Sequence, residues 1–190
     1  GLLVVTGHVR FDELPGLLDF DTIILLFSMM VINANLRLAG FFTLAGRSLL
    51  RLARSPRMLL AVEILLVGLL SALFLNDTIC LMLTPLMLEI LVALERNPIP
   101  YLIALATASN IGSTATLTGN PQNMIIGVAS GIPYISFAAA LLPVALLGLG
   151  AIWLVLVKLY PYDFRHDERL GLPESEVVVD RWMVIKTLLV

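Results

Sequence analysis

The sequence predicts an all-α integral membrane protein, a polytopic helical bundle with one re-entrant helical hairpin and one broken transmembrane helix. Of its 190 residues, 59% are hydrophobic and 14% are charged, and the mean hydropathy is +0.97. A soluble domain carries about 25% charged residues, so this chain has too few charges to cover a water-facing surface. Its long apolar runs instead match the length of membrane spans, and polar residues interrupt two of them.

The charge and the chemistry-bearing residues exclude several classes of protein. The formal net charge is −2 and the sequence pI is about 5.6, so there is no basic field that would bind nucleic acid. The chain has one cysteine, Cys80, which rules out an internal disulfide and a cysteine-based zinc site. His8 and His166 stand apart from any metal-ligand spacing, and no phosphate-binding loop or nucleophile motif is present. We therefore expect neither an enzyme nor a resident metal or organic cofactor.

The first predicted span covers residues 20–44. Its apolar run is long enough to cross a bilayer, since about 20 residues suffice. The arginines in and after its second half form a cluster that marks the cytoplasmic side of a membrane protein: Arg37, Arg47, Arg51, Arg54 and Arg57. The chain therefore enters its next apolar segment from the cytoplasm.

Residues 58–95 are almost continuously apolar and predict the re-entrant hairpin. A break at residues 76–78, Asn-Asp-Thr, divides this run into arms of about 18 and 16 residues, each short for a full span. Arg57 precedes the first arm and Arg96 follows the second, which places both ends on one side of the membrane. Two complete spans would give the same charge asymmetry, so that alternative stays open.

The broken transmembrane helix is predicted over residues 101–130. Residues 109–123 at its centre are almost all Ser, Thr, Asn, Gln, Gly or Pro, and none of them is ionised. After a turn, residues 134–157 form a further apolar span.

Residues 1–157 thus form one transmembrane domain. We expect a cytoplasmic linker at residues 158–181 and the start of another transmembrane segment at residues 182–190. Because the chain opens with Gly1 inside an apolar run and closes inside another, we expect it to be a fragment of a longer protein.

Asp77 is the strongest single indication of function. A carboxylate near the centre of a bilayer costs about 2.5–3.5 kcal/mol on insertion scales and usually marks an ion or proton pathway. Asn76 and Thr78 add short oxygen-bearing side chains, so the three residues form a candidate coupling-ion site. The alternative is structural, with Asn76 or Asp77 capping the helix that follows. The two roles are compatible.

The polar break offers a second candidate site. Gly112 and Gly119 are expected to let the backbone unwind, and Asn120 and Pro121 to restart a helix, with Asn120 as its cap. Such a restart presents free N–H groups and a positive dipole end, while unwound carbonyls and hydroxyls can coordinate a hard cation. The alternative is close helix packing through small residues. The candidate substrate-binding residues are Asn110, Gly112, Ser113, Thr114, Thr116, Gly119, Asn120, Pro121 and Asn123.

Two motifs carry a resemblance to a known family. The first is Asn-Asp-Thr at residues 76–78 followed by Thr84-Pro85, and the second is the run from Ala108 to Asn123, which ends in Gly-Asn-Pro-Gln-Asn. Over roughly residues 19–157 the chain resembles the arsenite permease and sodium/proton antiporter family of the ion transporter superfamily. The Gly-Asn-Pro-Gln-Asn version is similar to plant silicon efflux transporters and their bacterial relatives.

The resemblance implies a secondary transporter of two inverted repeats, each with a re-entrant hairpin and a broken helix. This chain would be the first repeat with its linker. Its expected partners are the lipid bilayer, the second repeat, a small inorganic solute and a second copy in a homodimer. In the related sodium/dicarboxylate symporters the hairpin tip reads Ser-Asn-Thr and contributes to a sodium site. Asp77 in place of that asparagine favours a titratable, proton-coupled site.

We therefore predict a multi-pass protein of the plasma membrane that moves a small inorganic anion or a neutral oxyacid, such as arsenite or silicate. A proton or a sodium ion is the expected coupling ion. The alternatives are a sodium/proton antiporter and a non-transporting membrane assembly protein. Glu63 and Glu89, inside the hairpin arms, are expected to pair with Arg57 or Arg96 and to be structural.

Overall fold

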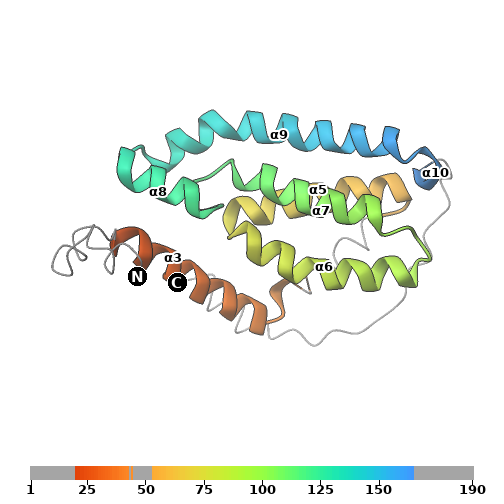
Figure 1. Ribbon diagram of the computed structural model, residues 1–190, viewed down its shortest axis with the longest axis horizontal. Helices are drawn as coiled ribbons and strands as arrows, with labels where there is room; N and C mark the ends of the chain where they lie inside the picture. The colour runs from red at the N-terminus through yellow and green to blue at the C-terminus, as the bar shows by residue number, and fades with distance from the viewer. Residues whose placement is uncertain (1–19, 43, 45–52, 165–190) are drawn as a thin grey trace, which may run out of the picture.

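The structure, a computed structural model, describes residues 20–42, 44 and 53–164. Within these residues every regular element is a helix, and the predicted all-α fold class is confirmed (Figure 1). The helices are α3 (Phe20–Leu38), α5 (Pro56–Leu73), α6 (Asn76–Ala93), α7 (Ile99–Ser113), α8 (Pro121–Ser130), α9 (Tyr134–Leu159) and α10 (Pro161–Phe164). By length and composition, α3, α5, α6 and α9 could each cross a membrane.

Helices α5 and α6 occupy the segment where the sequence predicts the hairpin. The hydroxyl of Ser55 caps α5 by accepting a hydrogen bond from the Met58 N–H, and Pro56 stands in its first turn, where its fixed φ suits a helix start. The backbone is extended at Phe74, and α6 begins two residues later. The chain reverses at this point, so the start of α5 and the end of α6 lie at the same end of the molecule (Figure 1).

Helices α5 and α7 run parallel and lie in direct contact. The Tyr101 hydroxyl donates to the Pro56 carbonyl (3.2 Å) near the start of both helices, and Ser71 donates to Ser109 (3.1 Å) near their ends. Where α7 meets α5, Gly112 lies so close to Gly68 that a methyl group on Gly112 would stand 2.2 Å from the Gly68 carbonyl oxygen. Small residues permit this kind of backbone approach between membrane helices.

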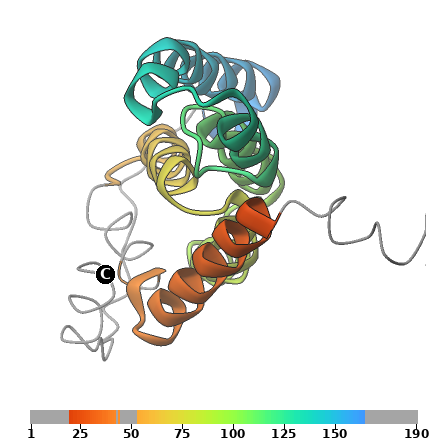
Figure 2. The ribbon, with the colours of Figure 1, turned by 90° about the vertical axis from the view of Figure 1, so that its left-hand side faces the viewer.

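Helix α9 is the longest described helix, with 26 residues, and runs along α5 and α7 (Figure 1). Its Leu149 packs against Gly68 of α5, and its Gly148 lies against Ile111 of α7. Viewed along the long axis of the molecule, α9 covers one side of α5 and α7, while α3 lies on the other side (Figure 2). The core between these helices is made mainly of buried aliphatic side chains, among them Leu59, Leu60, Ile64, Val67, Leu105, Leu149 and Leu156.

Polar contacts fasten the end of the molecule at which α5 begins. Arg57 Nε donates to the Phe164 carbonyl (2.8 Å), and the indole N–H of Trp153 donates to the Arg57 carbonyl (3.2 Å). Asn97 Nδ2 donates to the Asp163 carboxylate (3.2 Å). These bonds join α5, α9, α10 and the α6–α7 connection, so this end is held together independently of the hairpin tip.

Helix α3 contacts the rest of the bundle at two places. Along its length it packs against α8, and past its end Phe41 and Phe42 make edge-to-face contacts with Phe74 at the hairpin tip. Its outer face is apolar and open, with Phe27 67% exposed, as suits a helix in contact with lipid. Of the predicted linker, residues 165–181 lie outside the described part of the chain, as do residues 182–190.

Candidate functional site

The two polar interruptions predicted from the sequence meet in space. Asn76, the first residue of α6, donates its backbone N–H to the Gly119 carbonyl (3.1 Å) and its side-chain amide to Asn110 Oδ1 (3.1 Å). Its own carbonyl accepts a hydrogen bond from the Ser109 hydroxyl (3.1 Å). The tip of the α5–α6 pair is therefore fixed to both sides of the break between α7 and α8.

This junction lies beside the middle of α9. Ala72 of α5, Ala115 of the break and Ala145 of α9 form one buried apolar cluster, and the Thr116 hydroxyl donates to the Ala72 carbonyl. Ala145 is close to the midpoint of α9, which runs from Tyr134 to Leu159. A 26-residue helix is about 39 Å long and exceeds the hydrocarbon thickness of a bilayer. If α9 crosses the membrane, the junction lies near the membrane centre.

Two asparagine amides hold the break between α7 and α8 in shape. Asn120 Oδ1 accepts from the Asn123 N–H (2.9 Å), so the prediction that Asn120 caps the helix restarting at Pro121 is confirmed. Asn120 Nδ2 also donates to the Ser113 hydroxyl (3.1 Å). Asn123 Nδ2 donates to the carbonyls of Thr116 (2.8 Å) and Ser113 (3.2 Å). In this arrangement both asparagines position the loop.

The predicted hydroxyl ligands divide into buried and open groups. Ser113 donates to the Asn110 carbonyl (2.9 Å) and is only 2% exposed, while Thr116, which donates to Ala72, is 8% exposed. Thr114 donates to the Ile111 carbonyl (2.7 Å) but is exposed, as is the Asn110 side chain. Asn110 and Thr114 are therefore the members of the predicted set that a solute can reach directly.

The predicted glycines contribute space rather than unusual backbone conformation. Gly112 lies within helix α7, so the expectation that it unwinds the backbone is wrong, whereas Gly119 does lie in the non-helical segment between α7 and α8; neither glycine has a positive φ. A methyl group on Gly119 would stand 2.2 Å from the Ser113 carbonyl oxygen. Because it has no side chain, Gly112 lets α7 lie directly against Gly68 of α5. In the same way, Gly119 lets the loop after α7 pack against Ser113 at the end of that helix.

Asp77 does not join the hydrogen bonds that Asn76 makes. The N-cap residue of α6 is Leu75, without a side-chain cap bond, so the alternative of an Asn76 or Asp77 side-chain cap is wrong. The helix starts earlier than expected, and Asp77 lies in its first turn, where a negative charge interacts favourably with the helix dipole. Its side chain is exposed, and that of Thr78 is half-buried.

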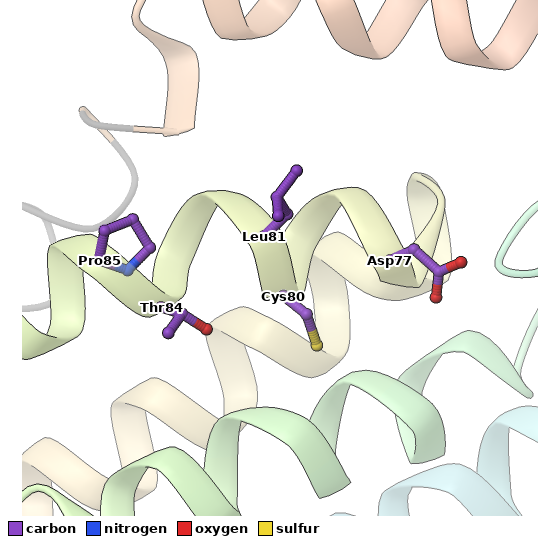
Figure 3. A pocket seen from close by; sticks show the side chains of 5 residues that line it. All are labelled: Asp77, Cys80, Leu81, Thr84 and Pro85. Atoms are coloured by element: carbon purple, nitrogen blue, oxygen red, sulfur yellow. The ribbon is translucent and has the colours of Figure 1, made fainter.

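The Asp77 carboxylate lines an open cavity along α6 with a volume of about 510 Å³. Cys80, Leu81, Thr84 and Pro85 complete its lining. In Figure 3 the five side chains lie along one face of α6, those of Asp77, Cys80 and Thr84 directed to the lower side of the view and those of Leu81 and Pro85 to the upper side. Cys80 and Thr84 were not predicted as site residues, although their spacing of three and seven from Asp77 indicates a shared helix face.

A row of hydroxyl groups connects the break to the start of α9. Thr118 Oγ1 lies 3.4 Å from Thr116 Oγ1 and 3.2 Å from the Tyr134 hydroxyl. Tyr134 is 42% exposed, whereas Thr116 is buried. Sequence reasoning missed the contact of Thr118 with Tyr134 and the bond between Ser71 and Ser109, because the two partners of each pair are far apart in the chain.

The acidic residues of the hairpin arms behave differently from the expectation. Glu63 is fully buried, and neither of its carboxylate oxygens has a hydrogen-bond partner among the described residues, so the expected pairing with Arg57 or Arg96 is wrong for Glu63. Arg57 is instead bound through its Nε to the Phe164 carbonyl. Glu89 is exposed on α6.

The chemical character of the junction is neutral and polar with one carboxylate. In the part of the chain that the structure describes, no three His, Cys, Asp or Glu side chains gather where they could hold a metal ion. The groups present are amides, hydroxyls and carbonyls, together with Asp77. Such oxygen atoms suit a hard cation or a proton, and the amides and hydroxyls suit a hydroxylated solute.

Comparison with known proteins relates the whole chain to membrane transporters. A family model described as citrate transporter matches residues 1–190. The silicon efflux transporter LSI3 of Oryza sativa subsp. japonica is 41% identical over 161 residues, covering 84% of this chain and 33% of that protein. The putative transporter arsB of Dictyostelium discoideum is 32% identical over 165 residues, covering 87% and 29%.

A 46 kDa membrane protein of Mycobacterium leprae is 36% identical over 190 residues, covering 97% of this chain and 44% of that protein. The chain thus spans less than half the length of these relatives. No solved structure matches it.

Proposed function

Because this chain belongs to the citrate transporter family, we propose that it carries the solute and ion site of a secondary active transporter for a small inorganic anion or neutral oxyacid. The observation that carries the proposal is the junction itself. The Asn76 bonds to Asn110 and Gly119 bring two helix interruptions together beside the middle of a long apolar helix. Secondary transporters bind substrate where helices break near the membrane centre.

The groups at the junction favour a neutral hydroxylated solute. Asn110 and Thr114 are exposed there, and one carboxylate, Asp77, lies on the adjoining turn of α6. An anion such as citrate would meet this carboxylate without a neighbouring lysine or arginine in the break, whereas an undissociated oxyacid can donate to and accept from amide and hydroxyl groups. The name of one relative, a silicon efflux transporter, supports the same solute class.

Asp77 is the proposed binding residue for the coupling ion. Its carboxylate oxygens line the cavity along α6, and the Thr84 hydroxyl lines the same cavity about two helical turns further on. A proton or a sodium ion fits such oxygen ligands, and binding either one cancels the negative charge before the solute enters. Asn76 holds the turn that carries Asp77 and acts as a positioning residue.

The proposed site lies on an open side of α6. We propose that a second repeat of the same protein covers this side. The matched region covers only 29% to 44% of the length of these relatives, which supports this assignment. A homodimer in the plasma membrane is the corresponding proposal for the assembled protein.

The test is solute flux into proteoliposomes that contain the full-length protein. Arsenite, silicate, citrate and sodium are offered in turn, with and without a pH gradient and with and without a sodium gradient. Uptake of arsenite or silicate that a gradient accelerates is the expected result. Uptake of citrate without uptake of arsenite or silicate would overturn the proposed solute class. The absence of flux for every solute would favour a role in membrane assembly.

A sodium/proton antiporter is the second candidate. The observation that favours it is that the Asp77 carboxylate lines a cavity to which no residue of the α7–α8 break contributes. Sodium flux driven by a pH gradient, with no effect of arsenite or silicate, would select this function over the first.

A further inference from the structure

Glu63 is a buried carboxyl group that the proposed site does not use. It is 0% exposed in the middle of α5, and both of its carboxylate oxygens lack a hydrogen-bond partner in the described residues. It stands on the stretch of α5 between the Pro56–Tyr101 contact and the Ser71–Ser109 contact. The buried α7 residues along that stretch, Ala104, Leu105 and Ala108, have no side-chain donor to offer.

The ionisable groups of the neighbouring elements are engaged elsewhere or lie at a distance along the helices. Tyr101 of α7 is within electrostatic range of Glu63, but its hydroxyl donates to the Pro56 carbonyl. Arg96, before α7, and Asp163 of α10 lie around the same tyrosine. The remaining groups on α5 and on the elements packed against it are Arg57 on α5 itself, Asp77, Cys80 and Glu89 on α6, Tyr134, Lys158 and Tyr160 on or at the ends of α9, and Tyr162 of α10.

Among the described residues no donor bonds to the Glu63 carboxyl group, and this determines which form of Glu63 the packing can hold. An ionised carboxylate in a closed apolar interface loses its hydration without compensation, whereas the neutral carboxyl is far easier to bury. Because the side chain is already covered, water reaches it only when the helices around it separate. An apolar side chain would fill the same space at lower cost, so packing alone does not account for a glutamate here.

We propose that Glu63 is a second proton-binding site of the transporter, separate from Asp77, which holds a proton while α5 and α7 are closely packed and releases it to water when they separate. The proposal rests on the proposed transport function. A proton taken up from water as a carboxyl O–H on closing is returned to water on opening. Protonation of Glu63 therefore stabilises the close packing of α5 against α7, and close packing in turn favours the protonated form. A pH gradient imposed across the membrane then shifts the equilibrium between packed and separated helices.

The first test is infrared spectroscopy of the purified full-length protein, which needs no transport activity. At neutral pH the wild-type protein should show the carbonyl stretch of a protonated carboxyl that is absent from Glu63→Gln and present in Glu89→Gln. Glu89 is the matched control because it is an exposed glutamate of the same hairpin. Identical spectra for wild type and Glu63→Gln would overturn the proposal. Carbon-13 labelling of glutamate shows in the wild type whether the band comes from a glutamate, so the lack of any glutamate carboxyl band would overturn the proposal even if Glu63→Gln fails to fold.

The second test separates coupling from solute movement. Glutamine resembles the protonated carboxyl in shape, so Glu63→Gln should keep the exchange of labelled for unlabelled solute across the liposome membrane and lose the acceleration by a pH gradient. Retained acceleration would overturn the coupling role. If the wild type moves no solute at all, the proposed function fails, and the infrared result still decides whether Glu63 holds a proton.

Discussion

At the scale of single residues, Asn76 and Asp77 are neighbours with different tasks. Asn76 makes hydrogen bonds on both sides of the α7–α8 break, while the Asp77 carboxylate points into the open cavity along α6. An amide can donate and accept at the same time, which suits it to joining two segments. A carboxylate only accepts when ionised, which suits it to binding a cation or a proton.

Asp77→Asn should abolish gradient-driven transport and leave the folded protein in the membrane. The substitution removes the charge that binds the coupling ion but keeps the size of an exposed side chain that makes no cap bond. Uptake into proteoliposomes and the thermal unfolding midpoint in detergent would be measured together. Glu89→Gln, which removes an exposed carboxylate from the same helix, should leave uptake unchanged. A pH-gradient response that survives in Asp77→Asn would remove Asp77 from the coupling mechanism.

Gly119→Ala should destabilise the protein by about 1–3 kcal/mol, because the added methyl group overlaps the Ser113 carbonyl oxygen and the loop must shift. Thermal unfolding of the detergent-solubilised protein would measure the loss. Gly150→Ala is the matched control, since a methyl group on Gly150 of α9 meets nothing within 4 Å. Equal unfolding midpoints for the two variants would show that the loop does not pack as described.

At the scale of elements, the helices were easier to predict than their contacts. The lengths of the apolar runs indicated helices at 58–95 and 134–157, and the structure has α5, α6 and α9 there. The Asn120 cap was also predictable, because Asn-Pro is a local start signal for a helix. Local patterns do not state which helices touch, however, so the contact of Gly68 with Gly112 and the isolation of Glu63 became visible only in three dimensions.

The α5–α6 pair provides the prediction at this scale. Its tip lies beside the middle of α9, whereas the turn at residues 131–133 lies at an end of that helix. A re-entrant hairpin therefore predicts that an impermeant thiol reagent added outside labels Ile132→Cys quickly and Thr78→Cys slowly. Both variants would be made in a Cys80→Ser background, since Cys80 is free and only partly buried. Equally fast labelling at both positions would mean that α5 and α6 are two complete spans.

At the scale of the whole molecule, family membership and the four apolar helices agree on a multi-pass integral membrane protein. The resemblance read from the two motifs is confirmed by the match to the citrate transporter family and by relatives named for silicon efflux and arsB. What the chain contributes by itself is one hairpin and one broken helix. Among the described residues, the open cavity along α6 is lined by this helix alone.

Residues 1–190 alone should therefore not transport solute. The open carboxylate and amides at the junction would meet lipid in place of protein or water, and unsatisfied polar groups in hydrocarbon cost several kcal/mol each. Activity should return when the remainder of a full-length protein of the family is fused or co-expressed with this chain, and both forms would be assayed by arsenite or silicate uptake at matched protein amounts. The Asp77→Asn form of the fused protein serves as the inactive control. Uptake by purified residues 1–190 as a monomer would contradict both the second repeat and the placement of the solute site between two repeats.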